Sequence, residues 1–213
     1  MFYEASGPHG LKHNPFKALV SPRPIGWVSS MDKDGDLNLA PFSFFNAIAD
    51  NPPQVVLGVN GPHPEGGSKD TLSNIRETEE FVVNLVSYEL RDAMNATSEM
   101  VARKVNEFEL GGLTSAPSKM IKVPRVKESP ANLECKLQQI IELPTNNPDH
   151  INSMIIGEVV GIHIDDAVID DGMVNMEKYQ LLARLGYKDY TYVNNVFSLD
   201  RPDQEAQNKY LNR

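Results

Sequence analysis

Cysteine is almost absent from this chain of 213 residues, and Cys135 is its single example. One thiol forms no disulfide within the chain and cannot hold a metal cluster on its own. We therefore expect Cys135 to be a small core residue in a strand, and we expect no metal site.

Long apolar runs are also missing. No stretch of roughly 18 consecutive apolar residues occurs, so the sequence predicts no transmembrane helix and no membrane partner. The first residues, MFYEASGPHGLKH, lack the basic start and apolar run of a secretory signal. Together these features predict a cytoplasmic protein.

Positive charge is scarce. The chain has 20 lysines and arginines against 29 aspartates and glutamates, a formal net charge of −9. Binding to a nucleic-acid backbone needs a basic surface, so we expect no nucleic-acid partner. A single small phosphate remains possible, because a few local cations and backbone N–H groups suffice to hold it.

Several familiar catalytic and nucleotide-binding motifs are absent. A P-loop needs Gly before its Lys and Ser or Thr after it, whereas Ser68 precedes Lys69 and Asp70 follows it. No Gly-x-Gly-x-x-Gly fingerprint occurs either. Because we find no nucleophile–base pair and no paired-acid motif, the sequence predicts no catalytic side chain of its own.

What the chain does contain is organised around residues 21–60. Residues 25–31 are rich in apolar and β-branched side chains and predict a strand, and the turn-forming DKDGD of 32–36 follows. Residues 37–40 alternate, which sends Asn38 and Ala40 to the opposite face from the two leucines. Pro41 cannot donate to a sheet ladder, so this strand must end or lie at an edge there.

The next segment, PFSFFN (41–46), has an unusual composition for a connection. We interpret it as a loop that either grips a planar, polar ligand or plugs the end of a barrel with its phenylalanines. Composition alone favours neither reading.

A Gly-rich loop at 61–68 leads into a helix. Ser68 or Asp70 can cap this helix, and Leu72 and Ile75 give it an apolar stripe. The residues expected to face the loop side are Thr71, Ser73 and Asn74.

The start of this helix is a candidate site for one phosphate. Lys69 and the Thr71 hydroxyl would lie beside free N–H groups at the positive end of the helix. The alternative is that Lys69 is a solvated charge and Asp70 merely a cap.

The rest of the chain predicts a mainly β protein. Residues 133–143 alternate, with Cys135 on the apolar face and Glu134 on the opposite, polar face. A helix is expected at 88–96, with an interrupted extension toward residue 105. Arg103 and Lys104 form a basic pair on this segment that either lies on a solvated face or reaches a phosphate. Further strands are expected at 55–59, 81–86, 119–126 (an edge strand) and 153–164, the last bent at Gly157 and Gly161.

These elements predict an antiparallel Greek-key barrel with accessory helices, forming one domain over 1–213 with an N-terminal arm (1–20) and a C-terminal tail (200–213). We expect Trp27 to lie in the core rather than in a pocket wall. His163 falls among apolar residues, which favours a hydrogen-bonded barrel histidine over a catalytic one.

Several motifs together resemble the flavin reductase-like family of FMN-binding split β-barrel proteins, in its flavoredoxin and flavin-reductase-component branch. They are PRPIGWVSS, NLAPFSFFN and PPQVVLGV within 22–59, and the segments 69–86, 155–166 and 183–193. This resemblance implies a split barrel that binds FMN, and a homodimer with the flavin near the subunit interface. It also implies hydride transfer from NADH or NADPH, with the flavin carrying the chemistry.

The resemblance also implies a set of cofactor-binding residues. Asn38 and Asn46 would meet the uracil-like edge of the ring, Ser43 or Thr71 the phosphate, and Arg184 either a phosphate or a partner subunit. The full set is Arg23, Pro24, Asn38, Ala40, Pro41, Phe42, Ser43, Phe44, Phe45, Asn46, Lys69, Asp70, Thr71 and Arg184.

Two functions remain open at this point. One is an NAD(P)H:flavin oxidoreductase that feeds reduced flavin to a monooxygenase or another acceptor. The other is a non-catalytic FMN electron carrier of the flavoredoxin type. A barrel that has lost its cofactor is a third reading.

Overall fold

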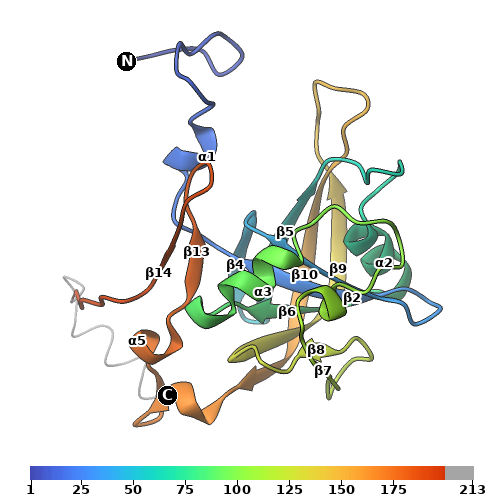
Figure 1. Cartoon of the computed structure of the whole chain (residues 1–213), viewed down its shortest axis with the longest axis vertical. Helices are drawn as coiled ribbons and strands as arrows, with labels where there is room; N and C mark the ends of the chain where they lie inside the picture. The colour runs from blue at the N-terminus through green and yellow to red at the C-terminus, as the bar shows by residue number, and fades with distance from the viewer. Residues whose placement is uncertain (200–213) are drawn as a thin grey trace.

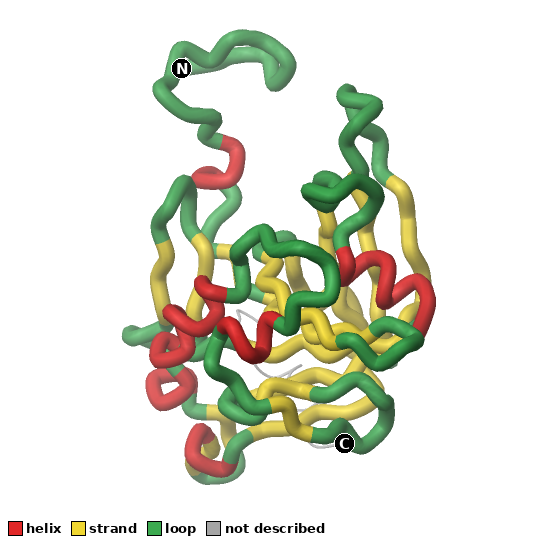
Figure 2. The backbone as a smooth tube through the Cα atoms, turned by 45° about the vertical axis from the view of Figure 1, so that its right-hand side comes forward, coloured by secondary structure: helices red, strands yellow, loops and turns green. Residues whose placement is uncertain are grey.

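A computed structural model describes residues 1–199 of the chain (Figure 1). The predicted C-terminal tail lies outside the described residues. The predicted N-terminal arm carries one short helix, α1 (Phe16–Leu19), and the residues before it extend away from the strands (Figures 1 and 2).

The centre of the molecule is a seven-stranded antiparallel sheet. Its strands follow the order β3-β2-β6-β9-β10-β5-β4. The predicted strands at 25–31, 37–40, 55–59, 81–86, 133–143 and 153–164 all belong to it. The bounds are β2 (Gly26–Met31), β3 (Leu37–Phe42), β4 (Phe45–Asp50), β5 (Pro53–Asn60), β6 (Glu80–Leu85), β9 (Ala131–Glu142) and β10 (Asn152–Ile164).

The two edge strands of this sheet, β3 and β4, are consecutive in the chain and are joined by Ser43 and Phe44 alone. The sheet therefore curls until its edges approach each other, and it stays open between them. This is an antiparallel split barrel with few helices, so the fold class predicted from the sequence is confirmed. The segment 41–46 is strand, turn and strand, so its prediction as a loop is wrong.

Bulges in β10 produce much of the curvature. The register between β10 and β9 shifts at Ile156/Gly157 and again at Val159/Gly161, as the two glycines predicted. A Cβ atom on Gly157 would lie 2.4 Å from Cζ of Phe81, so this position also requires glycine for close packing.

The barrel interior holds the largest apolar cluster, which includes Leu57, Phe81 and Cys135. Cys135 is buried in a strand, as predicted. Trp27 lies in a second cluster on the outer face of the sheet, where its Nε1 donates to Thr97 Oγ1 at 2.8 Å. Its predicted core position is confirmed.

Short elements surround the sheet. The helices are α2 (Asp70–Thr78), α3 (Arg91–Ala96), α4 (Glu107–Leu110) and α5 (Met176–Tyr179), with 3-10 turns η1 (Tyr88–Leu90) and η2 (Asp166–Val168). The remaining strands are β1 (Arg23–Pro24), β7 (Ser115–Ala116), β8 (Arg125–Val126), β11 (Ile169–Asp170), β12 (Met173–Val174), β13 (Leu182–Arg184) and β14 (Tyr190–Tyr192). None of the helices within residues 1–199 has the length and apolarity needed to cross a membrane.

Two predicted elements are shorter than the sequence suggested. The helix expected to reach residue 105 ends at Ala96, where the Thr97 hydroxyl donates to Met94 O and accepts from Trp27 Nε1. The edge strand expected over 119–126 is strand only at β8. Its first residues donate their backbone N–H groups to a carboxylate instead of to a sheet ladder.

That carboxylate belongs to Glu134, which was predicted on the solvent face of β9 and is fully buried. The segment 117–124 covers this face and donates the N–H groups of Lys119 (2.8 Å) and Met120 (2.6 Å) to it. His163 Nε2 lies 2.5 Å from Glu134 Oε1, so the predicted hydrogen-bonded barrel histidine is confirmed. Burial raises the pKa of Glu134, but these bonds outweigh burial and hold it below its ordinary value.

We expect His163→Ala to lower the free energy of unfolding by about 3 kcal/mol at neutral pH, because it leaves the Glu134 carboxylate buried without its partner. The depressed pKa of Glu134 contributes stability that is lost as the pH falls through it, and the variant should lose this stability at a higher pH. Urea denaturation across the acidic range measures both effects. A loss no larger than that of the exposed His150→Ala control would contradict the assignment.

Candidate functional site

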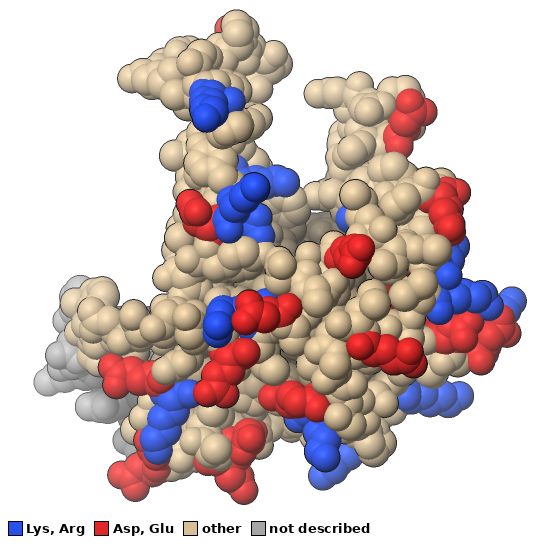
Figure 3. Space-filling view, viewed as in Figure 1, with Lys and Arg blue, Asp and Glu red and all other residues tan. Residues whose placement is uncertain are grey.

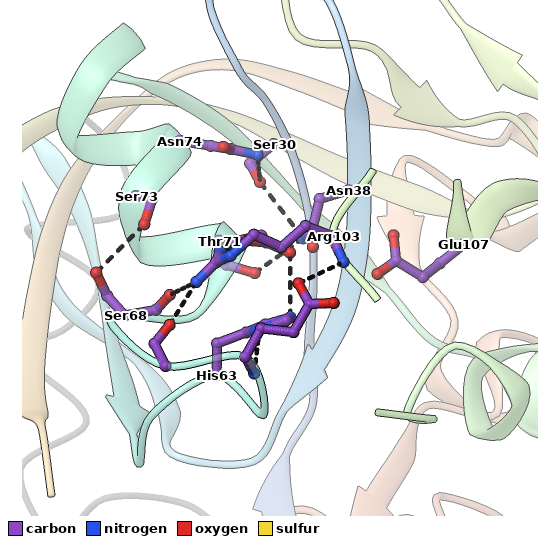
Figure 4. A network of polar contacts seen from close by, with 12 residues as sticks. Ser30, Asn38, His63, Ser68, Thr71, Ser73, Asn74, Arg103 and Glu107 are labelled. Atoms are coloured by element: carbon purple, nitrogen blue, oxygen red, sulfur yellow. Dashed lines mark hydrogen bonds and ion pairs between the residues drawn. The ribbon is translucent and has the colours of Figure 1, made fainter. Parts of the chain in front are cut away.

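A cleft lies on the open edge of the barrel, over strand β3 (Figure 4). The side chains of Asn38 and Ala40 line it, while Leu37 and Leu39 pack in the cluster on the other face, as the alternation predicted. The other walls are the start of α2, residues 62–64, residues 97–101 and Glu107 of α4.

The outer edge of β3 is covered by a carboxylate. The backbone N–H of Leu39 points away from β2 and donates to Glu107 Oε2 at 2.9 Å. Alternate residues of a strand direct their N–H groups to the same side, so position 41 would also point to this open edge. Pro41 therefore costs the sheet no ladder bond, and its predicted place at an edge is confirmed.

The start of α2 is tied to β3 and β2 by buried amide side chains. Asn38 Nδ2 donates to Thr71 Oγ1 at 2.9 Å, and Asn74 Nδ2 donates to Ser30 Oγ at 3.2 Å (Figure 4). Asn74 is buried against the sheet, so the prediction that it faces the loop side is wrong, whereas Thr71 is buried but lines the cleft beside loop residues 62–64. Because Thr71 Oγ1 accepts from Asn38, its own proton is available to an acceptor in the cleft.

The first turn of α2 has no side-chain cap. The N-cap position is Lys69, and neither Ser68 nor Asp70, the two predicted cap residues, caps the helix with its side chain. Ser68 Oγ contacts Ser73 Oγ at 3.2 Å, and the Asp70 carboxylate pairs with Arg103. The N–H groups at the positive end of this helix therefore lack a side-chain acceptor, which suits an anion.

Arg103 fixes the loop that precedes α2. Besides Asp70, its guanidinium donates to Gly66 O at 2.7 Å and to Ser68 O at 3.2 Å (Figure 4). The buried ring of His63 lies 3.6 Å from the other oxygen of Asp70. The interpretation of Arg103 as part of a solvated face is therefore wrong, and its neighbour Lys104 pairs separately with Asp36 at 2.9 Å.

Lys69 is half-buried at the mouth of the cleft and has no ion pair within residues 1–199. Burial lowers its pKa, and the positive charge of Lys17 lowers it further. Lys17 belongs to α1 in the N-terminal arm, and its Nζ lies 5.8 Å from the centre of the Phe44 ring. Sequence reasoning missed Lys17, because nothing in the arm indicates that it approaches α2.

Glu107 is the second residue that sequence reasoning missed. Its side chain is buried in the cleft wall, and burial raises the pKa of the carboxyl while the Leu39 N–H opposes that shift. It comes from a single-turn helix in NEFELGG, a pattern that carries no signal for a buried acid.

A second cavity adjoins the first and shares Pro41 and Ser98 with it. It is lined by Ser43 and Arg184 among others, so it extends the cleft along β3 toward β13. The Arg184 guanidinium packs on the Tyr190 ring, 4.3 Å from its centre, and bonds the Tyr190 hydroxyl.

The two cavities together gather nine of the fourteen predicted site residues. The first contains Asn38, Ala40, Pro41, Phe42, Lys69, Asp70 and Thr71, and the adjoining one adds Ser43 and Arg184.

Five of the predicted site residues do not line these cavities. The Arg23 guanidinium instead binds the carbonyl oxygens of Lys17, Val20 and Leu185, joining the arm to the C-terminal hairpin. The other four are Pro24, which pairs with Ala183 in β1, Phe44, which packs on Gly58, Phe45, which lies in the barrel core, and Asn46, which is exposed on β4. The phenylalanine-plug reading of 41–46 is confirmed for Phe42 and Phe45.

The arrangement suits a ligand with an anionic end and a planar body. For the anionic end the cleft offers Lys69, the Thr71 hydroxyl and the uncapped turn of α2. Within the described residues no group of three or more His, Cys, Asp or Glu side chains is arranged to hold a metal ion.

Glu107→Ala should lower the free energy of unfolding by about 1–3 kcal/mol, because the buried Leu39 N–H loses its acceptor. Glu107→Gln keeps an oxygen for that bond and removes a charge that burial disfavours, so its loss should be smaller. Urea denaturation at neutral pH compares the two variants. Equal losses would show that the Leu39 bond does not secure this edge.

Comparison with known proteins agrees with this geometry. Residues 19–192 match the family described as "Flavin reductase like domain". An uncharacterized protein of Aquifex aeolicus is 45% identical over 173 residues, which cover 81% of this chain and 85% of that protein.

Two solved structures also superpose closely. Nitrilotriacetate monooxygenase component B from Bacillus cereus is 32% identical with a TM-score of 0.80, covering 91% of this chain and all of that one. Pseudomonas fluorescens 2-nitrobenzoate 2-nitroreductase NbaA is 34% identical with a TM-score of 0.77, covering 88% of each chain. The chain belongs to the flavin reductase-like family.

Proposed function

We propose that this protein binds FMN in the cleft over β3 and reduces it with NADH or NADPH. The observation that carries the proposal is Lys69 at the uncapped start of α2. Lys69 is half-buried in the cleft wall with no counter-charge in residues 1–199, and an FMN phosphate would supply that charge.

The size of the site supports a ligand longer than a phosphate. The first cavity is about 140 Å³, which is small beside the roughly 300–1,000 Å³ typical of cofactor sites. The adjoining cavity is about 320 Å³ and shares Pro41 with it. A phosphate at Lys69 and Thr71 with a planar ring directed toward Ser43 and Arg184 would occupy both.

In this proposal the side chains of the protein bind FMN and orient it. Asn38 holds the Thr71 hydroxyl so that its proton points to an acceptor, and Glu107 keeps the β3 edge from moving. Bound FMN would supply the chemistry by accepting a hydride equivalent from the reduced nicotinamide. No side chain is assigned a catalytic role.

The named relatives support a flavin-handling function of this kind. One is a monooxygenase component and another a nitroreductase, so an enzyme that passes electrons to a partner or a small acceptor fits the family. A flavoredoxin of Desulfovibrio vulgaris shares the fold at 19% identity. An FMN electron carrier is therefore the second candidate.

We also propose a homodimer. The arm projects from the barrel with exposed apolar side chains at Met1, Phe2 and Leu19, which suits packing on a second copy. Light scattering tests this, and a monomer that binds FMN would contradict it.

Lys69→Ala and Thr71→Ala should each weaken FMN binding by about tenfold, because each removes a bond to the phosphate. Lys104→Ala is the matched control, since Lys104 is exposed and paired with Asp36 outside the cleft. Quenching of flavin fluorescence on titration measures the affinities. Unchanged affinity in both cleft variants would overturn the phosphate position.

As the pH rises, the affinity for FMN should begin to fall at a lower pH than it would if Lys69 had an ordinary lysine pKa. The pKa of Lys69 is lowered, so its ammonium loses its proton at a lower pH, and the phosphate then loses a cation. Lys69→Arg stays charged throughout, so its affinity should decline less. Parallel declines in the two proteins would contradict this explanation.

Anaerobic mixing of the FMN-loaded protein with NADH or NADPH separates the two candidate functions. We expect fast bleaching of the flavin absorbance with at least one nucleotide. No bleaching with either nucleotide would favour the electron carrier.

A further inference from the structure

A separate cavity of about 360 Å³ lies between β8, the start of β9 and the end of β10. It shares no lining residue with the two cavities over β3. Three cationic side chains line it: Lys119, Arg125 and Lys127. We call it the β8 cavity.

Positive charge collects here although the protein is acidic overall, with a formal net charge of −9. On the face shown in Figure 3, acidic and basic side chains are intermixed. In the β8 cavity, by contrast, no carboxylate of residues 1–199 lies within ion-pair distance of any of the three cations.

The nearby acids do not form ion pairs with these cations. Glu128, which follows Lys127, turns away and accepts the Thr114 N–H through both carboxylate oxygens, at 3.1 and 3.2 Å. Asp165 lines the cavity, but its Oδ1 accepts the Ala167 N–H at 2.9 Å. Glu134 is fully buried behind His163 and bonds two backbone amides in addition to that ring.

Arg125 is the most enclosed of the three cations that line this cavity. Its place is set by β8, where Val126 N–H donates to the buried Asn84 side chain at 2.8 Å. Its Nε is enclosed without an acceptor, and Nη1 has only a 3.4 Å contact with Asn132 Oδ1. A partly desolvated cation that lacks a counter-charge is unfavourable, so an anion in the cavity would stabilise it.

We propose that the β8 cavity binds a small multivalent oxyanion, a phosphate or polycarboxylate group. Arginine and lysine side chains directed into one cavity form charge-assisted hydrogen bonds to such groups. The site is distinct from the proposed FMN site, because none of its lining residues lines the cavities over β3.

Calorimetric titration with pyrophosphate and with citrate tests the proposal. The measurements use the Lys69→Ala protein as background, so that the contribution of the phosphate position at α2 is reduced. We expect saturable binding of at least one probe, weakened about tenfold by Lys127→Ala and by Arg125→Gln. Lys127 is exposed, so its variant should fold even if Arg125→Gln does not.

Lys122→Ala is the matched control, because Lys122 is an exposed lysine of the same loop that does not line the cavity. It should leave the affinity unchanged. Absence of saturable binding for both probes would overturn the proposal. So would equal weakening by Lys122→Ala and Lys127→Ala, which would indicate only general attraction to surface lysines.

Discussion

The break between β3 and β4 is the constraint on which the rest of the molecule depends. A closed barrel would satisfy every strand edge, whereas this one leaves β3 with outward-facing backbone groups. The chain secures that edge with Glu107 on the Leu39 N–H, with Asn38 on Thr71, and with a proline at position 41. The same three features form walls of the cleft, so the device that protects the edge also shapes the site.

The cationic side chains differ in whether they have a partner within the protein. Several cations within residues 1–199 pair with carboxylates or carbonyl groups, as Arg103 does with Asp70 and Arg23 does with the arm. Lys69 in the cleft and Arg125 in the β8 cavity are partly buried, and neither has a carboxylate within ion-pair distance among residues 1–199. A partly buried cation without a counter-charge is a place where an external anion gains more than it does at an exposed, solvated cation.

Local patterns in the sequence predicted much of the fold. Alternation at 37–40 placed Asn38 and Ala40 on the cleft side, and the spacing of Gly157 and Gly161 located the bends of β10. These predictions held because each depends on neighbours along one strand. The predicted place of Glu134 was wrong because the segment that covers it comes from 117–124, and alternation cannot show what packs on a face.

Some residues of the candidate site could likewise be predicted from a local pattern, and others could not. Lys69 and Thr71 could be named from the start of one helix, whereas Glu107 and Lys17 reach the site only through tertiary packing. The most direct measurement is a crystal structure of the protein grown with FMN. We expect its phosphate within hydrogen-bond distance of Lys69 Nζ and Thr71 Oγ1, with the ring along β3 toward Arg184. A flavin bound away from β3, or a phosphate held by other residues, would contradict it.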